Sequence, residues 1–188
     1  MEKVRHITTP LTEETARSLS AGDQVTLSGS LYTARDAAHA RLCNLILEAK
    51  PLPVELEGQT IYYAGPSPAK PGAVIGSIGP TTSGRMDQFT PLLLERAGLR
   101  AMIGKGDRSQ AVIEAMIRSG AVYFAAIGGA AALLAKCTIS CEIVCWEELG
   151  TEAIRKMTVN NMPLTVAIDC RGENLYAQGP RRYAHVAR

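Results

Sequence analysis

Two adjacent hydroxyl side chains and an arginine form the most chemically suggestive stretch of the sequence. In "GPTTSGRMD", residues 79–87, Thr81 and Thr82 stand between a Gly-Pro turn and Arg85. An apolar run precedes this stretch and an amphipathic run follows it, which is typical of a corner between a strand and a helix. The free N–H groups at a helix N-terminus favour anions, and arginine offers a planar fork for a carboxylate. The stretch is therefore a candidate anion-binding or catalytic site, or only a well-made turn.

Two further glycine-rich corners have the same setting between a predicted strand and a predicted helix. They are "GKGDRS", which carries Lys105, and "IGGA", which contains Gly128 and Gly129. In open α/β sheets, ligands bind beyond the carboxyl ends of the strands. Arg85 and Lys105 together therefore predict a pocket suited to carboxylate or phosphate, to which the two glycines contribute shape only.

Simpler interpretations of the same residues stay open. Thr81 or Thr82 could merely cap the following helix, which is a common use of threonine. Arg85 and Lys105 could be ordinary solvated charges. Neither corner matches a phosphate-binding P-loop, because neither contains glycine followed by lysine and then serine or threonine at the required spacing.

Arg35 is the third basic candidate. The T-x-x-D pattern from Thr33 to Asp36 resembles a capping box and predicts a helix that starts near Thr33. Arg35 then falls in the first turn, where its charge opposes the helix dipole, and a residue that breaks a local rule is a functional candidate. The alternative is a surface arginine stabilised by Asp36. His39, four residues further on, is interpreted as structural.

Five cysteines raise the question of a metal cluster. Three of them, Cys137, Cys141 and Cys145, form C-x3-C-x3-C, and the others are Cys43 and Cys170. The surrounding "ISCEIVCW" is rich in β-branched residues and predicts a strand, in which residues four apart lie roughly 13 Å apart. That spacing is too wide for one compact cluster, so the cysteines are interpreted as free thiols with small apolar side chains.

The elements that position these residues predict an α/β fold with a mixed sheet or a barrel-like β part. Expected early elements are a strand in "KVRHITT", a helix in "TPLTEETARSL" capped by Thr9 or Thr12, and strands in "QVTLSGSLYT" and "TIYYAG". From residue 72, strands are expected at 74–78, 100–103, 122–126 and 139–146. Helices are expected between them at 86–97, 109–119 and 130–136. "AIRKMTVNN" and "PLTVAIDCRGENLY" predict two more strands.

The overall composition limits the possible classes of protein. The 188 residues are 46% hydrophobic, with a formal net charge of +2. One domain over residues 1–188 is expected. The balanced charge argues against a nucleic-acid surface, and the lack of a long apolar run argues against a membrane span. The N-terminal residues lack the apolar segment of a signal peptide, so a cytoplasmic protein is expected.

Several motifs together resemble a known family. "LYTARDAAHARL", "GPTTSGRMD", "IGKGDRSQ", "YFAAIGGAAALLA" and "EELGTEAIRKMTV" are similar to the beta subunit of class I, iron–sulfur-dependent fumarate hydratase. In single-chain members this part is the carboxy-terminal domain. The resemblance extends from about Ile7 to Tyr176.

The resemblance implies a fold, an activity and a set of site residues. The fold would be a swivelling β/β/α domain, and the activity a reversible hydration of fumarate to L-malate in the tricarboxylic acid cycle. Thr81 would exchange the proton at substrate carbon 3, Arg85 and Lys105 would contact substrate carboxylate, and Arg35 would also bind substrate. A 4Fe-4S cluster would be held by an alpha subunit, in a hetero-oligomer such as alpha2beta2.

Two other functions stay open at this point. The beta subunit of L-tartrate dehydratase has a similar scaffold, although Gly84 and "GKGDRS" favour the fumarase branch. A non-catalytic anion-binding module would also explain the basic corners, but it would not explain the paired hydroxyls beside Arg85.

Overall fold

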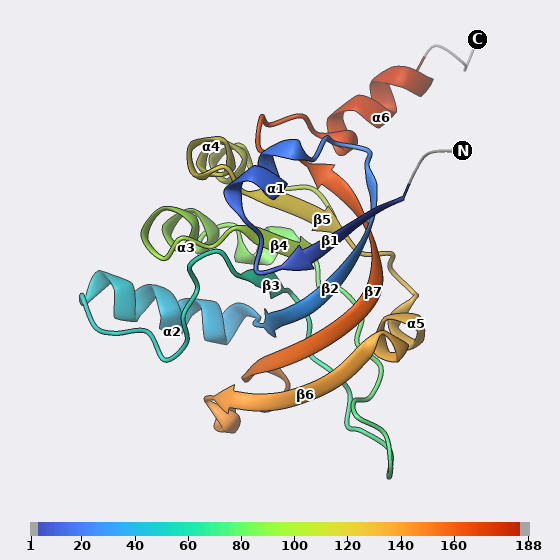
Figure 1. Cartoon of the computed structure of the whole chain (residues 1–188). Helices are drawn as coiled ribbons and strands as arrows, with labels where there is room; N and C mark the ends of the chain where they lie inside the picture. The colour runs from blue at the N-terminus through green and yellow to red at the C-terminus, as the bar shows by residue number, and fades with distance from the viewer. Residues whose placement is uncertain (1–3, 185–188) are drawn as a thin grey trace.

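Strands and helices alternate along the described part of the chain, residues 4–184 of a computed structural model (Figure 1). The strands are β1 (Arg5–Thr9), β2 (Gln24–Thr33), β3 (Thr60–Tyr62), β4 (Ala101–Gly104), β5 (Val122–Ala125), β6 (Thr138–Cys145) and β7 (Ile154–Ile168). The α-helices are α1 (Glu13–Ser18), α2 (Asp36–Leu47), α3 (Thr90–Arg96), α4 (Gln110–Ser119), α5 (Ala131–Lys136) and α6 (Leu175–Tyr183). Two short 3-10 helices cover Ser83–Met86 and Glu147–Glu152.

The strands form one mixed sheet that closes on itself. The order is β1-β2-β3-β4-β5-β7-β6, and β2 also pairs with β7. Neighbours from β1 to β5 are parallel, whereas β7 runs antiparallel to β2, β5 and β6. The β2–β7 pairing therefore joins β2, β3, β4, β5 and β7 into a ring. The predicted α/β fold with a mixed sheet is confirmed.

The central strands β4 and β5 contact a different hydrophobic cluster on each of their two faces. On β4 and β5, Ile103 and Phe124 face one cluster, while Met102 and Tyr123 face another that includes residues of α2, α3 and α4. Figure 1 shows these three helices along one side of β3, β4 and β5. Strands buried on both faces lose the alternation of polar and apolar residues, which explains their continuous apolar sequences.

The parallel arrangement brings four strand ends to one edge of the sheet. The C-terminal ends of β2, β3, β4 and β5 lie there, because these strands are consecutive parallel neighbours. Arg35 follows β2, and Lys105 follows β4 directly. The fold therefore gathers at this edge, hereafter the site edge, the corners that the sequence singles out.

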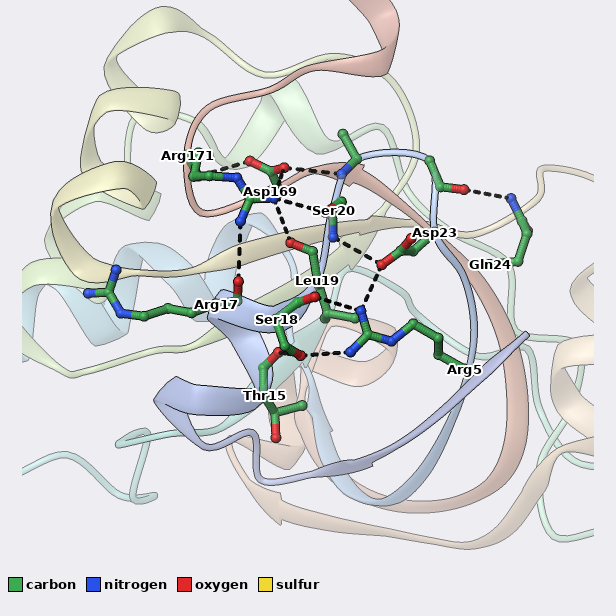
Figure 2. Close-up of polar contacts among 12 residues, drawn as sticks. Arg5, Thr15, Arg17, Ser18, Leu19, Ser20, Asp23, Gln24, Asp169 and Arg171 are labelled. Carbon is green, nitrogen blue, oxygen red and sulfur yellow. Dashed lines mark hydrogen bonds and ion pairs between the residues drawn. The ribbon is translucent and has the colours of Figure 1, made fainter. Parts of the chain in front are cut away.

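A polar network occupies the opposite edge of the sheet (Figure 2). Arg5, at the start of β1, donates to the carbonyl and hydroxyl oxygens of Ser18 at 2.6 and 2.7 Å and to Asp23 at 2.9 Å. Arg171, just after β7, donates to Asp169 at 2.6 Å and to the carbonyl of Leu19 at 2.9 Å. The carbonyls left free at the end of α1 are thereby satisfied by two arginines.

The strand predicted at residues 74–78 is wrong. This segment belongs to an irregular loop, in which Val74 is exposed and the Ser67 amide donates to the Ser77 carbonyl. Because β3 pairs directly with β4, the sheet has no place for another parallel strand between them. The "GPTTSG" corner therefore follows a loop rather than a strand.

Three other expectations about the elements need correction. Thr33 is the last residue of β2, where it pairs with Tyr62 and Arg155, so it cannot cap α2. The helix expected at 86–97 becomes α3 from Thr90, after a 3-10 turn. The two strands expected near the C-terminus are the single strand β7, which pairs with β2 along most of its length. The sequence did not predict α6.

Candidate active site

The segment from Thr81 to Ser83 lies against the end of β4. The Lys105 amide donates to the Thr81 carbonyl at 3.3 Å, and the Ser83 amide donates to the Lys105 carbonyl at 2.8 Å. These two bonds make a short parallel bridge between Thr82 and Lys105. The Thr81 amide also donates to the carbonyl of Tyr63, just after β3, at 2.7 Å. Backbone bonds thus extend the sheet by one step and place the two site corners side by side.

The two threonines have different surroundings. Thr81 is partly buried, whereas Thr82 is exposed and precedes the 3-10 helix as its N-cap residue. The Thr82 side chain makes no capping hydrogen bond. Capping therefore does not explain the hydroxyl of Thr82, and Thr81 stands one position too early to be the cap.

Lys105 lies at the surface, in the corner after β4, between the segment that contains Thr82 and the corner after β5 that contains Gly128. A Cβ added at Gly128 would meet the Lys105 Cδ atom at 4.0 Å, so the lysine side chain extends toward the corner after β5. Within residues 4–184 the Lys105 ammonium has no ion pair. Gly128 and Gly129 are both exposed, and they leave this side of the lysine open.

Arg35 is the N-cap residue of α2, not a residue of its first turn. Its backbone is extended, and its side chain makes no capping bond. The Nη2 atom lies 3.5 Å from Glu152 Oε1, while Glu152 Oε2 accepts from the Ala37 amide at 2.8 Å. Glu152, from the Glu147–Glu152 turn, therefore satisfies the helix N-terminus and faces the arginine at the same time.

Asp36 connects Arg35 with Arg85. Its Oδ1 accepts from Arg85 Nε at 2.9 Å, and its Oδ2 lies 4.0 Å from Arg35 Nε. Both the Arg35 Nε and the Asp36 Oδ2 atoms are buried without a hydrogen-bond partner within the described residues. The expected pairing of Asp36 with Arg35 is thus the weaker of its two contacts. Because Arg85 uses only Nε here, its two terminal nitrogens remain available for a carboxylate.

His39 lies beneath Arg35 and is fully buried. Its Nδ1 donates to the Arg35 carbonyl at 2.8 Å, and its ring packs edge-on against Tyr63 with centroids 5.2 Å apart. Burial lowers the pKa of His39 to about 4. The ring is therefore neutral near pH 7 and supports the backbone at Arg35, in agreement with the structural role expected for it.

Arg108 is a residue whose position the sequence did not reveal. Its side chain has no exposed surface, and it donates to Asp87 at 2.7 Å and to the Thr90 hydroxyl at 2.8 Å. The guanidinium also lies over the rings of Tyr63 and Tyr123, at 5.3 and 5.1 Å from their centroids. The "DRS" of "GKGDRS" therefore fixes the corner after β4 to the start of α3.

The cysteines do not converge on a common point. Cys137 precedes β6, while Cys141 and Cys145 lie along it, as the sequence predicted. The described residues, 4–184, contain no group of three or more histidine, cysteine, aspartate or glutamate side chains that could hold a metal ion. Burial raises the pKa of the Cys137, Cys141 and Cys145 thiols. The metal-ligating side chains in the described part of the chain therefore do not fit an iron–sulfur cluster.

The site is an open surface rather than a closed cavity. Lys105 and Thr82 are exposed, and the Arg85 side chain is 51% exposed. A cavity of about 440 Å³ lies between the 66–76 loop and β6, but none of the candidate residues lines it. No helix within residues 4–184 is long and apolar enough to cross a membrane.

The fold and this edge define a mixed α/β protein with cationic groups and a hydroxyl at the ends of parallel strands. Residues 1–179 match the family model described as Fumarase C-terminus. The chain belongs to this fumarase C-terminal family, as the motifs indicated.

The relatives fall into two groups by length. The chain is 42% identical over 156 residues to "Fumarate hydratase class I, anaerobic" of Escherichia coli, covering 82% of this chain and 28% of that protein. It is 39% identical to "Fumarate hydratase 2" of Leishmania major, covering 84% and 28%. It is 38% identical to "Putative L(+)-tartrate dehydratase subunit beta" of Methanocaldococcus jannaschii, covering 89% of both chains. The chain thus spans just over a quarter of the fumarate hydratases and nearly all of the beta subunit.

Proposed function

We propose that the chain is the beta subunit of a hydro-lyase that reversibly hydrates fumarate to L-malate together with a cluster-bearing alpha subunit. The observation that carries this proposal is the continuous segment from residue 81 to residue 85. At one end it places Thr81 beside Lys105, and at the other it places Arg85 beside Asp36 and Arg35. A hydroxyl and three cations on one strand-end edge suit a dicarboxylate.

The cations supply the binding part of the proposed site. Arg35 and Arg85 keep donors free of the shared Asp36, and Lys105 provides a compact charge on the other side of the segment. The two carboxylates of fumarate or malate then occupy the two cationic positions. Charge-assisted bonds of this kind hold a planar carboxylate in a fixed orientation.

Thr81 supplies the proton-transfer part. A neutral hydroxyl is a poor base, so its alkoxide needs neighbouring positive charge, which Lys105 and Arg85 provide, or a partner carboxylate that relays the proton. In the malate direction the proton leaves carbon 3. Positive charge on the adjacent carboxylate stabilises the aci-carboxylate that results.

The open surface of the site edge supports the need for a partner in this proposal. The aligned segment covers 28% of the Escherichia coli class I fumarate hydratase, and the described residues, 4–184, do not fit a cluster. The 4Fe-4S cluster therefore belongs, in this proposal, to the alpha subunit. A hetero-oligomer such as alpha2beta2, a swivelling movement of this domain, a place in the tricarboxylic acid cycle and a cytoplasmic location are further parts of the same proposal.

The beta subunit of L-tartrate dehydratase is the second candidate. The near-complete mutual coverage with the Methanocaldococcus jannaschii protein favours it. The 42% identity to the Escherichia coli anaerobic fumarate hydratase, against 38% to the tartrate dehydratase subunit, and the presence of Gly84 and "GKGDRS" favour fumarate.

Anaerobic co-expression with the candidate alpha subunit from the same genome tests the proposal. Fumarate, mesaconate and tartrate are assayed in parallel with the complex and with the chain alone. We expect fumarate hydration by the complex only, and no visible-absorbing cluster on the chain after reconstitution. Dominant tartrate turnover would select the second candidate, and a cluster-loaded complex inactive on all three substrates would leave a non-catalytic anion-binding module.

A further inference from the structure

Two fully buried hydroxyl groups connect the two corners of the candidate site. Ser83 and Tyr123 have no exposed surface, and their hydroxyl oxygens lie 2.8 Å apart. The Tyr123 hydroxyl also lies 2.8 Å from the Gly106 carbonyl oxygen. Tyr123 therefore bridges a residue next to Thr82 and a residue next to Lys105.

The direction of these hydrogen bonds follows from the chemistry of the groups. A carbonyl oxygen can only accept, so the single hydroxyl proton of Tyr123 points to Gly106. The proton between Ser83 and Tyr123 must then come from Ser83. The result is a directed chain from the Ser83 hydroxyl through the Tyr123 hydroxyl to the Gly106 carbonyl, with no freedom to reverse.

Neighbouring residues stabilise the Ser83–Tyr123–Gly106 hydrogen bonds. A Cβ added at Gly104 would overlap the Ser83 hydroxyl, so glycine at this position leaves the space that the hydroxyl occupies. The Gly106 amide donates to the Tyr176 hydroxyl at 3.1 Å, which fixes the other side of the same peptide corner. Gly106 itself has a φ of 84°, a conformation that favours glycine.

We infer that Tyr123 is a positioning residue that holds Thr81 in register with Lys105 through the Ser83–Tyr123–Gly106 hydroxyl chain. The inference rests on the proposed function, because Thr81 and Lys105 have their roles there. The two backbone bonds between the corners involve only Thr81, Ser83 and Lys105, and of these residues Lys105 is exposed and Thr81 is only partly buried. The Ser83–Tyr123–Gly106 hydrogen bonds add a connection between two fully buried side chains, where a hydrogen bond is electrostatically stronger than in water.

Tyr123→Phe removes this connection and little else. The ring and its contact with the Arg108 guanidinium are kept, while the Ser83 hydroxyl and the Gly106 carbonyl lose their shared partner. Tyr62→Phe is the matched control. Tyr62 is equally buried, and its hydroxyl donates to the Ile78 carbonyl at 3.1 Å, outside the two bridged corners.

The first measurement is amide hydrogen exchange on the full chain without its partner. In Tyr123→Phe we expect the amides of Ser83 and Lys105 to exchange at least about tenfold faster than in the unmodified chain, because local opening becomes easier. Tyr62→Phe should leave both amides unchanged. Unchanged exchange at these amides in Tyr123→Phe would overturn the inference, whatever reaction the enzyme catalyses.

The second measurement is turnover by the assembled complex. Because proton transfer depends on the placement of Thr81, kcat should fall about ten- to a hundredfold in Tyr123→Phe while KM stays within about threefold. Ser83→Ala, which breaks the chain at its other end, should give the same split, and Tyr62→Phe should not. Equal kcat in all variants would overturn the inference. An inactive unmodified complex would instead refute the proposed function, and the exchange measurement would still decide the role of Tyr123.

Discussion

The two edges of the sheet use arginine in opposite ways. At the edge shown in Figure 2, Arg171 donates to Asp169, to the Ser20 hydroxyl and to the carbonyls of Arg17 and Leu19. Arg5 likewise donates to both oxygens of Ser18 and to Asp23. The donors of these two guanidinium groups are therefore used in hydrogen bonds within the protein.

At the site edge the cations retain unused donors. Arg85 uses only its Nε atom, Arg35 Nε has no hydrogen-bond partner, and Lys105 has no ion pair, all counted within residues 4–184. Buried polar atoms in folded proteins are nearly always paired, so an unpaired one needs an explanation. The comparison separates a network whose donors are used within the fold from an edge whose donors are partly unused, and it supports the proposal that the site edge binds an anionic ligand.

The largest effect on activity is expected for Thr81, the hydroxyl at the site edge. If Thr81 carries the proton, Thr81→Ala should lower turnover of the complex by about 10²- to 10⁴-fold, the range of acid–base catalysis. The free energy of unfolding should change by no more than about 1 kcal/mol, because the hydroxyl caps no helix. The measurement is turnover together with hydrogen exchange at malate carbon 3 in deuterated water.

Two neighbouring variants serve as controls for Thr81. Thr81→Ser should retain part of the activity, because the hydroxyl survives. Thr82→Ala should be milder than Thr81→Ala, because Thr82 shares the corner without the proposed role. Full carbon-3 exchange by Thr81→Ala would show that another residue moves the proton.

The next effect concerns stability at low pH and tests the buried support under Arg35. The pKa of His39 is about 4 in the folded chain and 6.5 ordinarily, so the unfolded chain binds more protons between these values. Stability is therefore lost as pH falls below the ordinary value toward the folded pKa, by up to about 3 kcal/mol. His39→Gln should flatten this loss in urea titrations. An equal pH slope in both proteins would contradict the neutral, buried state of His39.

Much of the fold was predictable because its signals are local. Thr12 caps α1 as expected, accepting from the Thr15 amide, and the periodic segments gave α4, α5, β4, β5 and β6 close to their observed bounds. The roles assigned to Thr81, Arg85, Lys105 and Arg35 stay predictions. The placement of Arg35 and Lys105 at one edge followed from the rule that parallel strands end on the same side. Thr81 and Arg85 reach that edge for another reason, because the segment at 81–83 bonds to the residue after β4.

What could not be predicted depends on contacts between distant elements. Arg108 looks like a surface charge in the sequence, but Asp87, Tyr63 and Tyr123 make its burial favourable. The Tyr123 hydroxyl has its role only because the segment at 81–83 lies against the end of β4. The segment 74–78 has an apolar strand-like pattern, yet direct β3–β4 pairing leaves it in a loop.

A smaller effect is expected when single cations of the site edge are removed. Lys105→Ala and Arg35→Ala should each lower kcat/KM of the complex about ten- to a hundredfold, because a charge-assisted contact contributes roughly 1.5–3 kcal/mol. Unfolding by urea should change little for Lys105→Ala, since Lys105 is exposed, and more for Arg35→Ala, since the Arg35 side chain is mostly buried and faces Glu152 and Asp36. Full activity of either variant at low substrate concentration would remove that residue from the binding site.

The smallest effect on activity is expected for Arg171→Ala at the opposite edge, and this variant tests whether the two edges have different roles. The change removes a side chain that donates to two carbonyls at the end of α1 and to Asp169. Because the Arg171 side chain is 50% exposed, water can replace part of these bonds, and the loss of stability should be about 1–2 kcal/mol. The kcat/KM of the complex should stay at its original value, the reverse of the pattern for Lys105→Ala. Urea unfolding and steady-state kinetics on both variants give the four values required. A fall in kcat/KM for Arg171→Ala without loss of stability would contradict this distinction. It would mean that an arginine whose donors are used within the fold can still be needed for activity.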